Sequence, residues 1–200
     1  MTKKKLFLAA IAPLTVALGS PAIAEESSKG VYVNGSIGVS SMANQAVTGI
    51  AEQIRHGKDF SYEIGIGYDF GKYRLEASFV DHEHNDAEWA AGNCNNCRAG
   101  WQSILATGYV DFENNTNWTP FVGFSVGSMT GDLVNDAGAA ADASGFVYGV
   151  QAGTSYKINS SVDIVGKISL LRSDDLDYGN TVVVPESHIY SLQIGARYRF

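Results

Sequence analysis

The sequence lacks a long apolar run after its first 24 residues. No later segment approaches the ~18 consecutive apolar residues that a membrane-spanning helix needs. Apolar residues at helical spacing, i, i+3, i+4 and i+7, do not persist beyond two turns in that part of the chain. Positive charge is also scarce, with 14 Lys and Arg against 21 Asp and Glu. These absences argue against helical membrane spans and, because phosphate binding needs cations, against nucleic acid as a partner.

The first 24 residues have the composition of a secretory signal peptide. Lysines at 3–5 form a basic start, an apolar stretch from Leu6 to about Gly19 follows, and Ala22-Ile23-Ala24 is a cleavage site. We therefore expect an exported protein that loses residues 1–24. This removal takes three lysines and no acidic residue, so the formal charge moves from −7 to −10.

Apolar and polar residues alternate along the rest of the chain, which favours strands because successive strand side chains point to opposite faces. Low proline content and abundant Gly, Tyr and Phe agree with strands. Each alternating run has about ten residues, the length at which a tilted strand crosses a bilayer. The eight runs are 31–40, 60–70, 73–81, 101–112, 118–129, 145–157, 162–172 and 188–200.

The two faces of these runs differ in a way that predicts which one meets lipid. The polar face holds charges in mid-strand, such as Glu63, Arg74 and Lys167, whereas the other face carries aromatic residues near both ends. Aromatic residues at the ends are typical of membrane-interface girdles. The least regular run, 101–112, is assigned with Ile104, Ala106, Val110 and Phe112 outward and Ser103, Thr107 and Asp111 inward.

The connections between runs alternate in length. Short turns are expected at 71–72, 113–117 and 158–161, and long connections at 41–59, 81–100, 130–144 and 173–187. Short turns at one end and long loops at the other indicate an outer-membrane barrel with both termini in the periplasm. The sequence thus predicts an all-β fold, an eight-stranded antiparallel transmembrane up-and-down barrel over 31–200, with 25–30 as a periplasmic lead.

Two motifs resemble those of known outer-membrane barrels. The ending Gln193-x-Gly195-x-x-Tyr198-x-Phe200 resembles the C-terminal signal that the barrel-assembly machinery recognises in bacterial outer-membrane proteins. The segment from Trp118 to Gly127 is similar to a recurrent strand of the small eight-stranded OmpX, Ail and opacity-protein type, and the resemblance covers residues 30–200. It implies the fold and a location in the outer membrane among lipopolysaccharide, but not an activity.

Charges of both signs are expected to meet inside the narrow lumen. An eight-stranded barrel is just wide enough for side chains to fill its interior, and an unpaired buried charge is costly. We therefore expect a paired network and no general diffusion pore. Its members are Glu63, Asp69, Arg74, Glu76, Asp163, Lys167, Arg197 and Arg199.

Cys94 and Cys97 lie in the second long connection. In an exported protein such a pair most often forms a disulfide, which here would shape the loop tip. The alternative is a zinc site completed by His82 and His84, since four such ligands suit tetrahedral zinc. The acidic long connections are also candidates for divalent cations, for example at Asp175-x-Asp177-x-Gly179.

Three classes of function are compatible with these features. The first is a non-enzymatic surface barrel whose loops contact a host, a phage or another surface ligand, or which supports envelope integrity. The second is a lipid A-modifying enzyme, for which Ser187 and His188 are the only adjacent Ser-His pair, although neighbours on a strand face opposite sides. The third is a narrow channel. We expect the non-enzymatic surface barrel, because no nucleophile motif is present. We expect no cofactor.

Overall fold

The computed structural model shows a closed β-barrel. It describes residues 29–42, 45–46, 53–55, 59–84, 88–89, 98–134, 140–177, 183–184 and 186–200, so the expected signal peptide lies outside the described residues. Within these ranges, no helix is long and apolar enough to cross a membrane.

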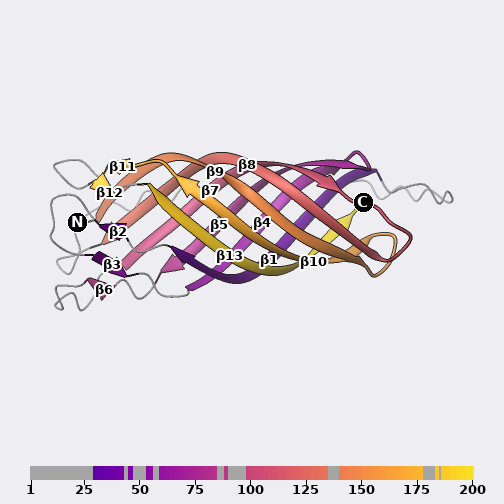
Figure 1. Ribbon diagram of the computed structural model, residues 1–200, viewed down its shortest axis with the longest axis horizontal. Helices are drawn as coiled ribbons and strands as arrows, with labels where there is room; N and C mark the ends of the chain where they lie inside the picture. Colours follow the sequence, from indigo (N-terminus) through magenta and orange to yellow (C-terminus); the bar gives the residue numbers. More distant parts are fainter. Residues whose placement is uncertain are drawn as a thin grey trace.

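Eight long strands form the barrel, and each pairs antiparallel with its neighbours along the chain. The last strand pairs with the first, with Ile37 opposite Ile194, and this closes the sheet (Figure 1). Closure satisfies the backbone hydrogen bonds of every strand, as lipid requires. The strands are β1 (Gly30–Met42), β4 (Asp59–Asp69), β5 (Tyr73–His84), β7 (Arg98–Asp111), β8 (Trp118–Val134), β9 (Ala140–Lys157), β10 (Val162–Ser173) and β13 (Ser187–Arg199).

Three short turns lie at the end of the barrel where β13 finishes (Figure 1). Between β4 and β5, Gly71 has φ 96° and donates its backbone N–H to Asp69 Oδ1 at 2.7 Å. Glycine adopts this left-handed conformation without the steric cost that a side chain brings. Between β9 and β10, Asn159 Oδ1 accepts the N–H groups of Ser161 and Val162 at 2.9 and 2.8 Å.

The long connections at the other end are shorter than the sequence predicts. The strands continue beyond the predicted runs and leave 43–58, 85–97, 135–139 and 174–186 between them. The largest error is in the third connection, predicted at 130–144. The prediction gave each strand only the length that crosses a bilayer, whereas β8 and β9 stay paired beyond that length, as far as Val134 and Ala140.

Short strands within the connections form two further small sheets (Figure 1). In the three-stranded sheet, Ile54 lies opposite Trp89, so the first two long connections are joined. The second sheet lies within the last connection. The short strands are β2 (Gln45–Ala46), β3 (Gln53–Arg55), β6 (Glu88–Trp89), β11 (Leu176–Asp177) and β12 (Val183–Val184).

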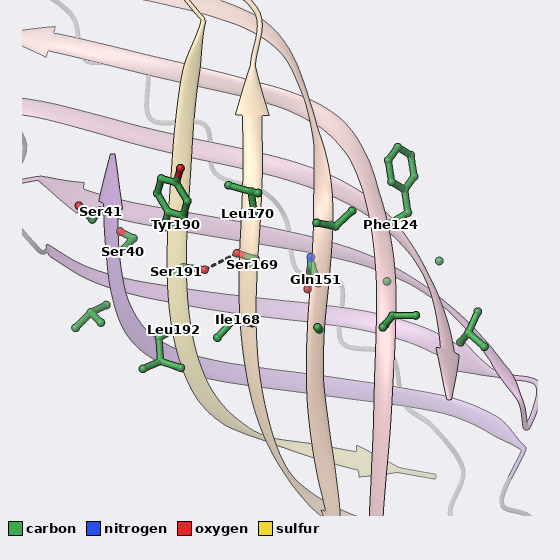
Figure 2. Close-up of a pocket in the computed structure, with 17 residues that line it drawn as sticks. Ser40, Ser41, Phe124, Gln151, Ile168, Ser169, Leu170, Tyr190, Ser191 and Leu192 are labelled. Atoms are coloured by element: carbon green, nitrogen blue, oxygen red, sulfur yellow. Dashed lines mark hydrogen bonds between the residues drawn. The ribbon is translucent and has the colours of Figure 1, made fainter. Parts of the chain in front are cut away.

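The outer face of the barrel is apolar. Figure 2 shows part of it, with Tyr190 and Leu192 on β13 beside Leu170 and Ile168 on β10. Aromatic rings pair near the short turns, with ring centroids 4.8 Å apart for Trp118 and Tyr156. A face this apolar is stable only in contact with lipid, so the predicted direction of the two strand faces agrees with the exposure of their side chains.

The lumen also contains a large apolar cluster, which the sequence argument missed. The cluster lies toward the long connections, and its side chains are all buried. Since no water channel remains to be lined at this width, large apolar residues can fill the interior as well as face lipid. The members are Met42, Val80, Trp101, Leu105, Met129, Ala143, Val147, Leu171 and Ile189.

Candidate functional site

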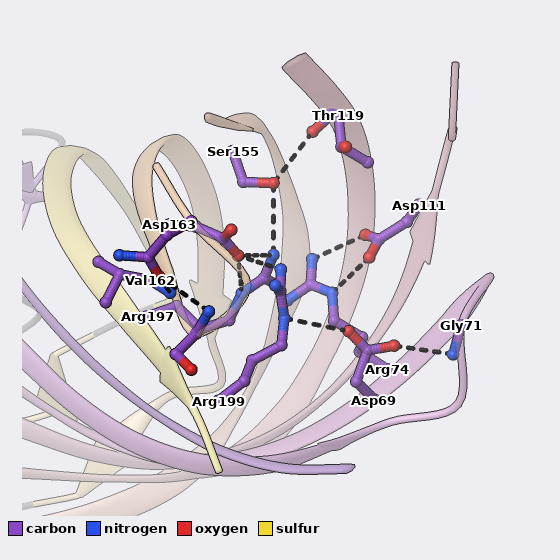
Figure 3. A network of polar contacts seen from close by, with 12 residues as sticks. Asp69, Gly71, Arg74, Asp111, Thr119, Ser155, Val162, Asp163, Arg197 and Arg199 are labelled. Carbon is purple, nitrogen blue, oxygen red and sulfur yellow. Dashed lines mark hydrogen bonds and ion pairs between the residues drawn. The ribbon is translucent and has the colours of Figure 1, made fainter. Parts of the chain in front are cut away.

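Buried ion pairs fill the lumen toward the short turns (Figure 3). Arg74 on β5 binds Asp111 on β7 through two bonds, Nε to Oδ2 at 2.7 Å and Nη2 to Oδ1 at 2.8 Å. The guanidinium also lies 4.4 Å from the ring centroid of Tyr109. A bidentate pair stacked on an aromatic ring holds the arginine in one orientation.

Two further arginines come from the last strand. Arg197 donates to Asp163 Oδ2 on β10 from Nε at 2.9 Å and from Nη2 at 2.7 Å. Arg199 contacts the same carboxylate and lies 3.7 Å from Asp69 on β4. Because β1 lies between β13 and β4, Arg199 reaches past β1 to contact Asp69 (Figure 3).

A third ion pair crosses the lumen farther from the turns. Lys167 Nζ on β10 lies 2.7 Å from Glu63 Oε1 on β4, although β13 and β1 stand between those strands. Both side chains are almost fully buried, at 5% and 3% exposure. Beside them the Tyr109 hydroxyl donates to Gln151 Oε1 at 3.0 Å and lies 3.4 Å from Glu76 Oε1. The contacts of Lys167 with Glu63 and of Tyr109 with Gln151 link strands that share no backbone hydrogen bonds.

Inward aromatic rings cover glycines on neighbouring strands and complete the filling. Tyr32 lies directly opposite Gly67, and a Cβ at Gly67 would come within 2.4 Å of the Tyr32 ring. Tyr109 covers Gly123 in the same way. A cavity between Arg74, Lys167 and their neighbours is about 20 Å³, close to the space of one water molecule.

The structure therefore brings together the charged residues that the sequence placed in the lumen. Alternation alone missed the role of Asp111, which the sequence assigned inward without a partner. Asp111 becomes the direct partner of Arg74 because β5 and β7 pair, with Tyr109 opposite Arg74. Asp111 shares the inward face of its strand with Thr107, and this placement could have marked it as a partner for a charge in the lumen.

The residues of the predicted disulfide, zinc and divalent-cation sites lie only partly within the described residues. Cys94 and Cys97 lie outside the described residues, as does Gly179, and His82 is buried at 1% exposure. Among the residues described, no group of three or more His, Cys, Asp or Glu could hold a metal ion. Ser187 is buried in the lumen, whereas His188, its neighbour on β13, lies on the opposite face.

The residues of the C-terminal motif divide between the two faces of β13. Gln193 and Gly195 face the lumen, and Gln193 Nε2 donates to Ser61 Oγ on β4 at 3.5 Å. Tyr198 and Phe200 are exposed on the outside, with ring centroids 5.1 Å apart. The strand thus offers an aromatic edge outward and a polar contact across β1 inward.

A closed antiparallel barrel with an apolar outer face, and with a lumen that contains ion pairs and an apolar cluster, defines a small integral β-barrel membrane protein. A family model described as outer membrane protein beta-barrel domain matches residues 10–200. The chain belongs to this family, and the predicted eight-stranded outer-membrane barrel is confirmed. No curated protein sequence matches the chain.

Several solved structures have the same fold. Neisserial surface protein A has a TM-score of 0.68 at 18% identity, over 85% of this chain and 97% of its own. Ail, the attachment invasion locus protein of Yersinia pestis, solved with the heparin analogue sucrose octasulfate, has a TM-score of 0.52 at 15% identity, over 86% of this chain and 99% of its own. The outer membrane protease OmpT of Escherichia coli has a TM-score of 0.50 at 9% identity, over 90% of this chain and 99% of its own. At these identities the likeness extends to the fold alone.

Proposed function

We propose that this protein is a non-enzymatic surface barrel that acts by binding through its long connections. The observation that carries the proposal is the filled lumen. Its ion pairs are buried, and the cavity between Arg74 and Lys167 is about 20 Å³. A lumen of this kind supports neither steady conduction nor a substrate site within the barrel. Recognition is then left to the end of the barrel that carries the long connections.

The charge of the connections indicates the kind of partner. In 43–58, 85–97, 135–139 and 174–186 the basic residues are Arg55 and Lys58. We infer a partner with a basic surface, or one bound through divalent cations. A sulfated polyanion such as the ligand seen with Ail fits this charge poorly. The acidic residues are Glu52, Asp86, Glu88, Asp136, Asp174, Asp175, Asp177 and Glu186.

Two other functions have less support. A lipid A-modifying enzyme needs a nucleophile and a base that reach the same substrate atom. Ser187 and His188 face opposite sides of β13, and the serine is 1% exposed. A narrow channel needs a continuous path, which the ion pair between Lys167 and Glu63 crosses.

The test is to replace the connections 43–58, 85–97 and 174–186 with short turns in one variant, since 135–139 is already as short as a turn. This barrel should still fold and reach the outer membrane, yet lose the binding that the wild type shows in a screen against host matrix proteins, lipopolysaccharide and phage. Single changes at His82, His84 and His188 provide the enzymatic comparison. If expression of the wild type shifts the mass of lipid A, and any of these changes abolishes the shift, the protein is an enzyme.

A further inference from the structure

Two polar rows lie on opposite sides of the outer face of the barrel. In the first row, Arg172 on β10 stands directly opposite His188 on β13. In the second row, Asp81 on β5 stands between Tyr62 on β4 and Gln102 on β7. In the closed order of eight strands, β10 and β5 are four positions apart. The two rows therefore face away from each other across the barrel.

Both rows face outward and lie at a similar depth in the membrane. The residues on either side of Arg172 and of Asp81 along their strands are buried in the lumen, namely Leu171, Ser173, Val80 and His82. Counted from the short turns, Arg172 comes ten residues after the start of β10, and Asp81 comes eight residues after the start of β5. Two copies that stand in the same direction therefore present the two rows at nearly the same level.

The rows carry opposite charges, and both keep capacity for further hydrogen bonds. Arg172 is 41% exposed and donates from Nη2 to Glu186, which leaves other N–H groups of its guanidinium for a second acceptor. Asp81 is 8% exposed, and Tyr62 and Gln102 both donate to its Oδ2, at 3.0 and 3.1 Å. Its Oδ1 accepts no hydrogen bond from the residues that the structure describes. An arginine side chain is long enough to reach a carboxylate set between two neighbours.

An apolar groove lies next to each row, on the side toward the short turns. The groove beside Arg172, of about 1020 Å³, is lined by Leu170 and Tyr190 among others (Figure 2). The groove beside Asp81, of about 1010 Å³, is lined by Phe79 and Ile104 among others. Apolar contact alone gives proteins little drive to associate in lipid, because acyl chains are equally apolar, so packing and polar contacts decide which faces meet.

We propose that copies of this protein associate side by side in the membrane, with Arg172 of one copy bound to Asp81 of the next. The charge complementarity of the two rows selects a second copy of this chain as the occupant of each face. Such a contact is heterologous, because it joins two different faces. Since these faces lie on opposite sides of the barrel, the association extends as a row and does not stop at a dimer.

A row would place the long connections of several copies next to one another. Several weak contacts then act on one partner, which raises the overall affinity without any new contact. This consequence rests on the proposed function, whereas the association itself does not. The association is measured without a binding partner, so that either proposal can fail while the other holds.

The charge test measures energy transfer between donor-labelled and acceptor-labelled full barrels refolded into phosphatidylcholine vesicles. Arg172→Gln and Asp81→Asn should each weaken self-association about tenfold, as expected when a charge-assisted hydrogen bond is lost. A mixture of the two variants should associate again but stop at dimers, because each variant keeps the face that the other has lost. Lys72→Gln, at an exposed turn at the other end, should behave as the wild type does.

The orientation test uses disulfide cross-linking of barrels in which Cys94 and Cys97 are changed to Ser. One variant adds Leu170→Cys, next to the Arg172 row, and the other adds Phe79→Cys, next to the Asp81 row. The mixed variants should form cross-linked dimers, whereas neither variant alone should do so. A contact between two different faces brings position 170 of one copy to position 79 of the next.

The proposal is overturned if Arg172→Gln has no more effect than Lys72→Gln. It is also overturned if the mixture of Arg172→Gln and Asp81→Asn associates no better than either variant alone. Recovery in that mixture would at the same time show that both variants fold. Cross-linking of Leu170→Cys or Phe79→Cys alone, as complete as in their mixture, would mean contact between identical faces or random collision, and would also overturn the proposal.

Discussion

At the scale of single residues, each buried cation of the lumen contacts a carboxylate in place of water. Arg74, Lys167 and Arg197 are each buried against a carboxylate on another strand. The attraction within a buried pair roughly offsets the cost of removing both ions from water. Loss of one partner is different, because the remaining charge keeps its desolvation cost.

Arg74→Ala is therefore expected to lower the free energy of unfolding by about 3–5 kcal/mol, since it leaves the Asp111 carboxylate buried alone. Arg197→Ala should have a similar effect through Asp163. Urea titration of the barrel in lipid vesicles measures the change, and replacing both Arg74 and Asp111 with Leu should recover most of it. If Arg74→Ala costs no more than Lys72→Ala at the exposed turn, the ion pair does not stabilise the barrel.

A second prediction concerns two glycines on opposite faces of the sheet. Gly67→Ala places a methyl group 2.4 Å from the Tyr32 ring, so it should destabilise the barrel by about 1–3 kcal/mol through overpacking. Gly108→Ala meets open space and should change stability by less than about 1 kcal/mol, with either sign. The same urea titration compares them. Equal effects would mean that Tyr32 moves freely and does not fill the lumen.

Sequence alternation assigned these residues to the correct face but could not pair them. Period two fixes inward and outward along one strand, and it does not fix which residues of two strands stand opposite each other. Arg74 and Asp111 meet because of the register between β5 and β7. Lys167 and Glu63 meet only because the sheet closes and brings β10 across from β4.

At the scale of strands, patterning worked where the two faces differ in polarity. β4 alternates cleanly, and its exposed residues Ile64 and Ile66 were predicted outward. β7 was the least regular run because both of its faces are apolar, with Trp101 and Leu105 inward and Ile104 outward. The alternation along β7 placed Ser103 and Thr107 correctly in the lumen. Hydrophobicity alone could not separate the two faces of this strand.

The last strand carries a prediction of its own. We expect Phe200→Ser to slow assembly into the outer membrane far more than it lowers the stability of the folded barrel. Phe200 is exposed and contacts Tyr198, so its loss removes little packing, whereas it belongs to the terminal motif expected to engage the assembly machinery. Pulse-chase measurement of the folded fraction in cells tests the rate, and Phe70→Ser, an exposed aromatic beside the first turn, serves as the control. Equal rates for the two variants would show that the ending is only a strand.

At the scale of the whole molecule, the two halves of the lumen close the barrel in different ways. The half near the short turns is closed by ion pairs, and the half near the long connections by the apolar cluster around Trp101 and Met129. The sequence predicted the first half from its charges. The sequence analysis missed the apolar half, because a tryptophan that points into the lumen cannot be told from one that faces lipid by its residue type alone.

A closed lumen of this kind should not conduct. Planar-bilayer recording of the refolded barrel is expected to show no steady current at about 100 mV, because ions would have to cross the buried apolar cluster. Replacing Trp101, Leu105 and Met129 with Ser should raise the frequency of transient openings. A stable pore of nanosiemens scale in the wild type would contradict the filled lumen and favour the channel function.

The central claim is that this is an outer-membrane barrel with its long connections outside the cell. Single cysteines at position 55 or 136, introduced after changing Cys94 and Cys97 to Ser, should react on intact cells with a thiol reagent that does not cross the membrane. Cysteines at positions 72 and 160, in two short turns, should react only after the outer membrane is permeabilised. Labelling of the short turns on intact cells, with protection of the long connections, would contradict the topology and the binding role that depends on it.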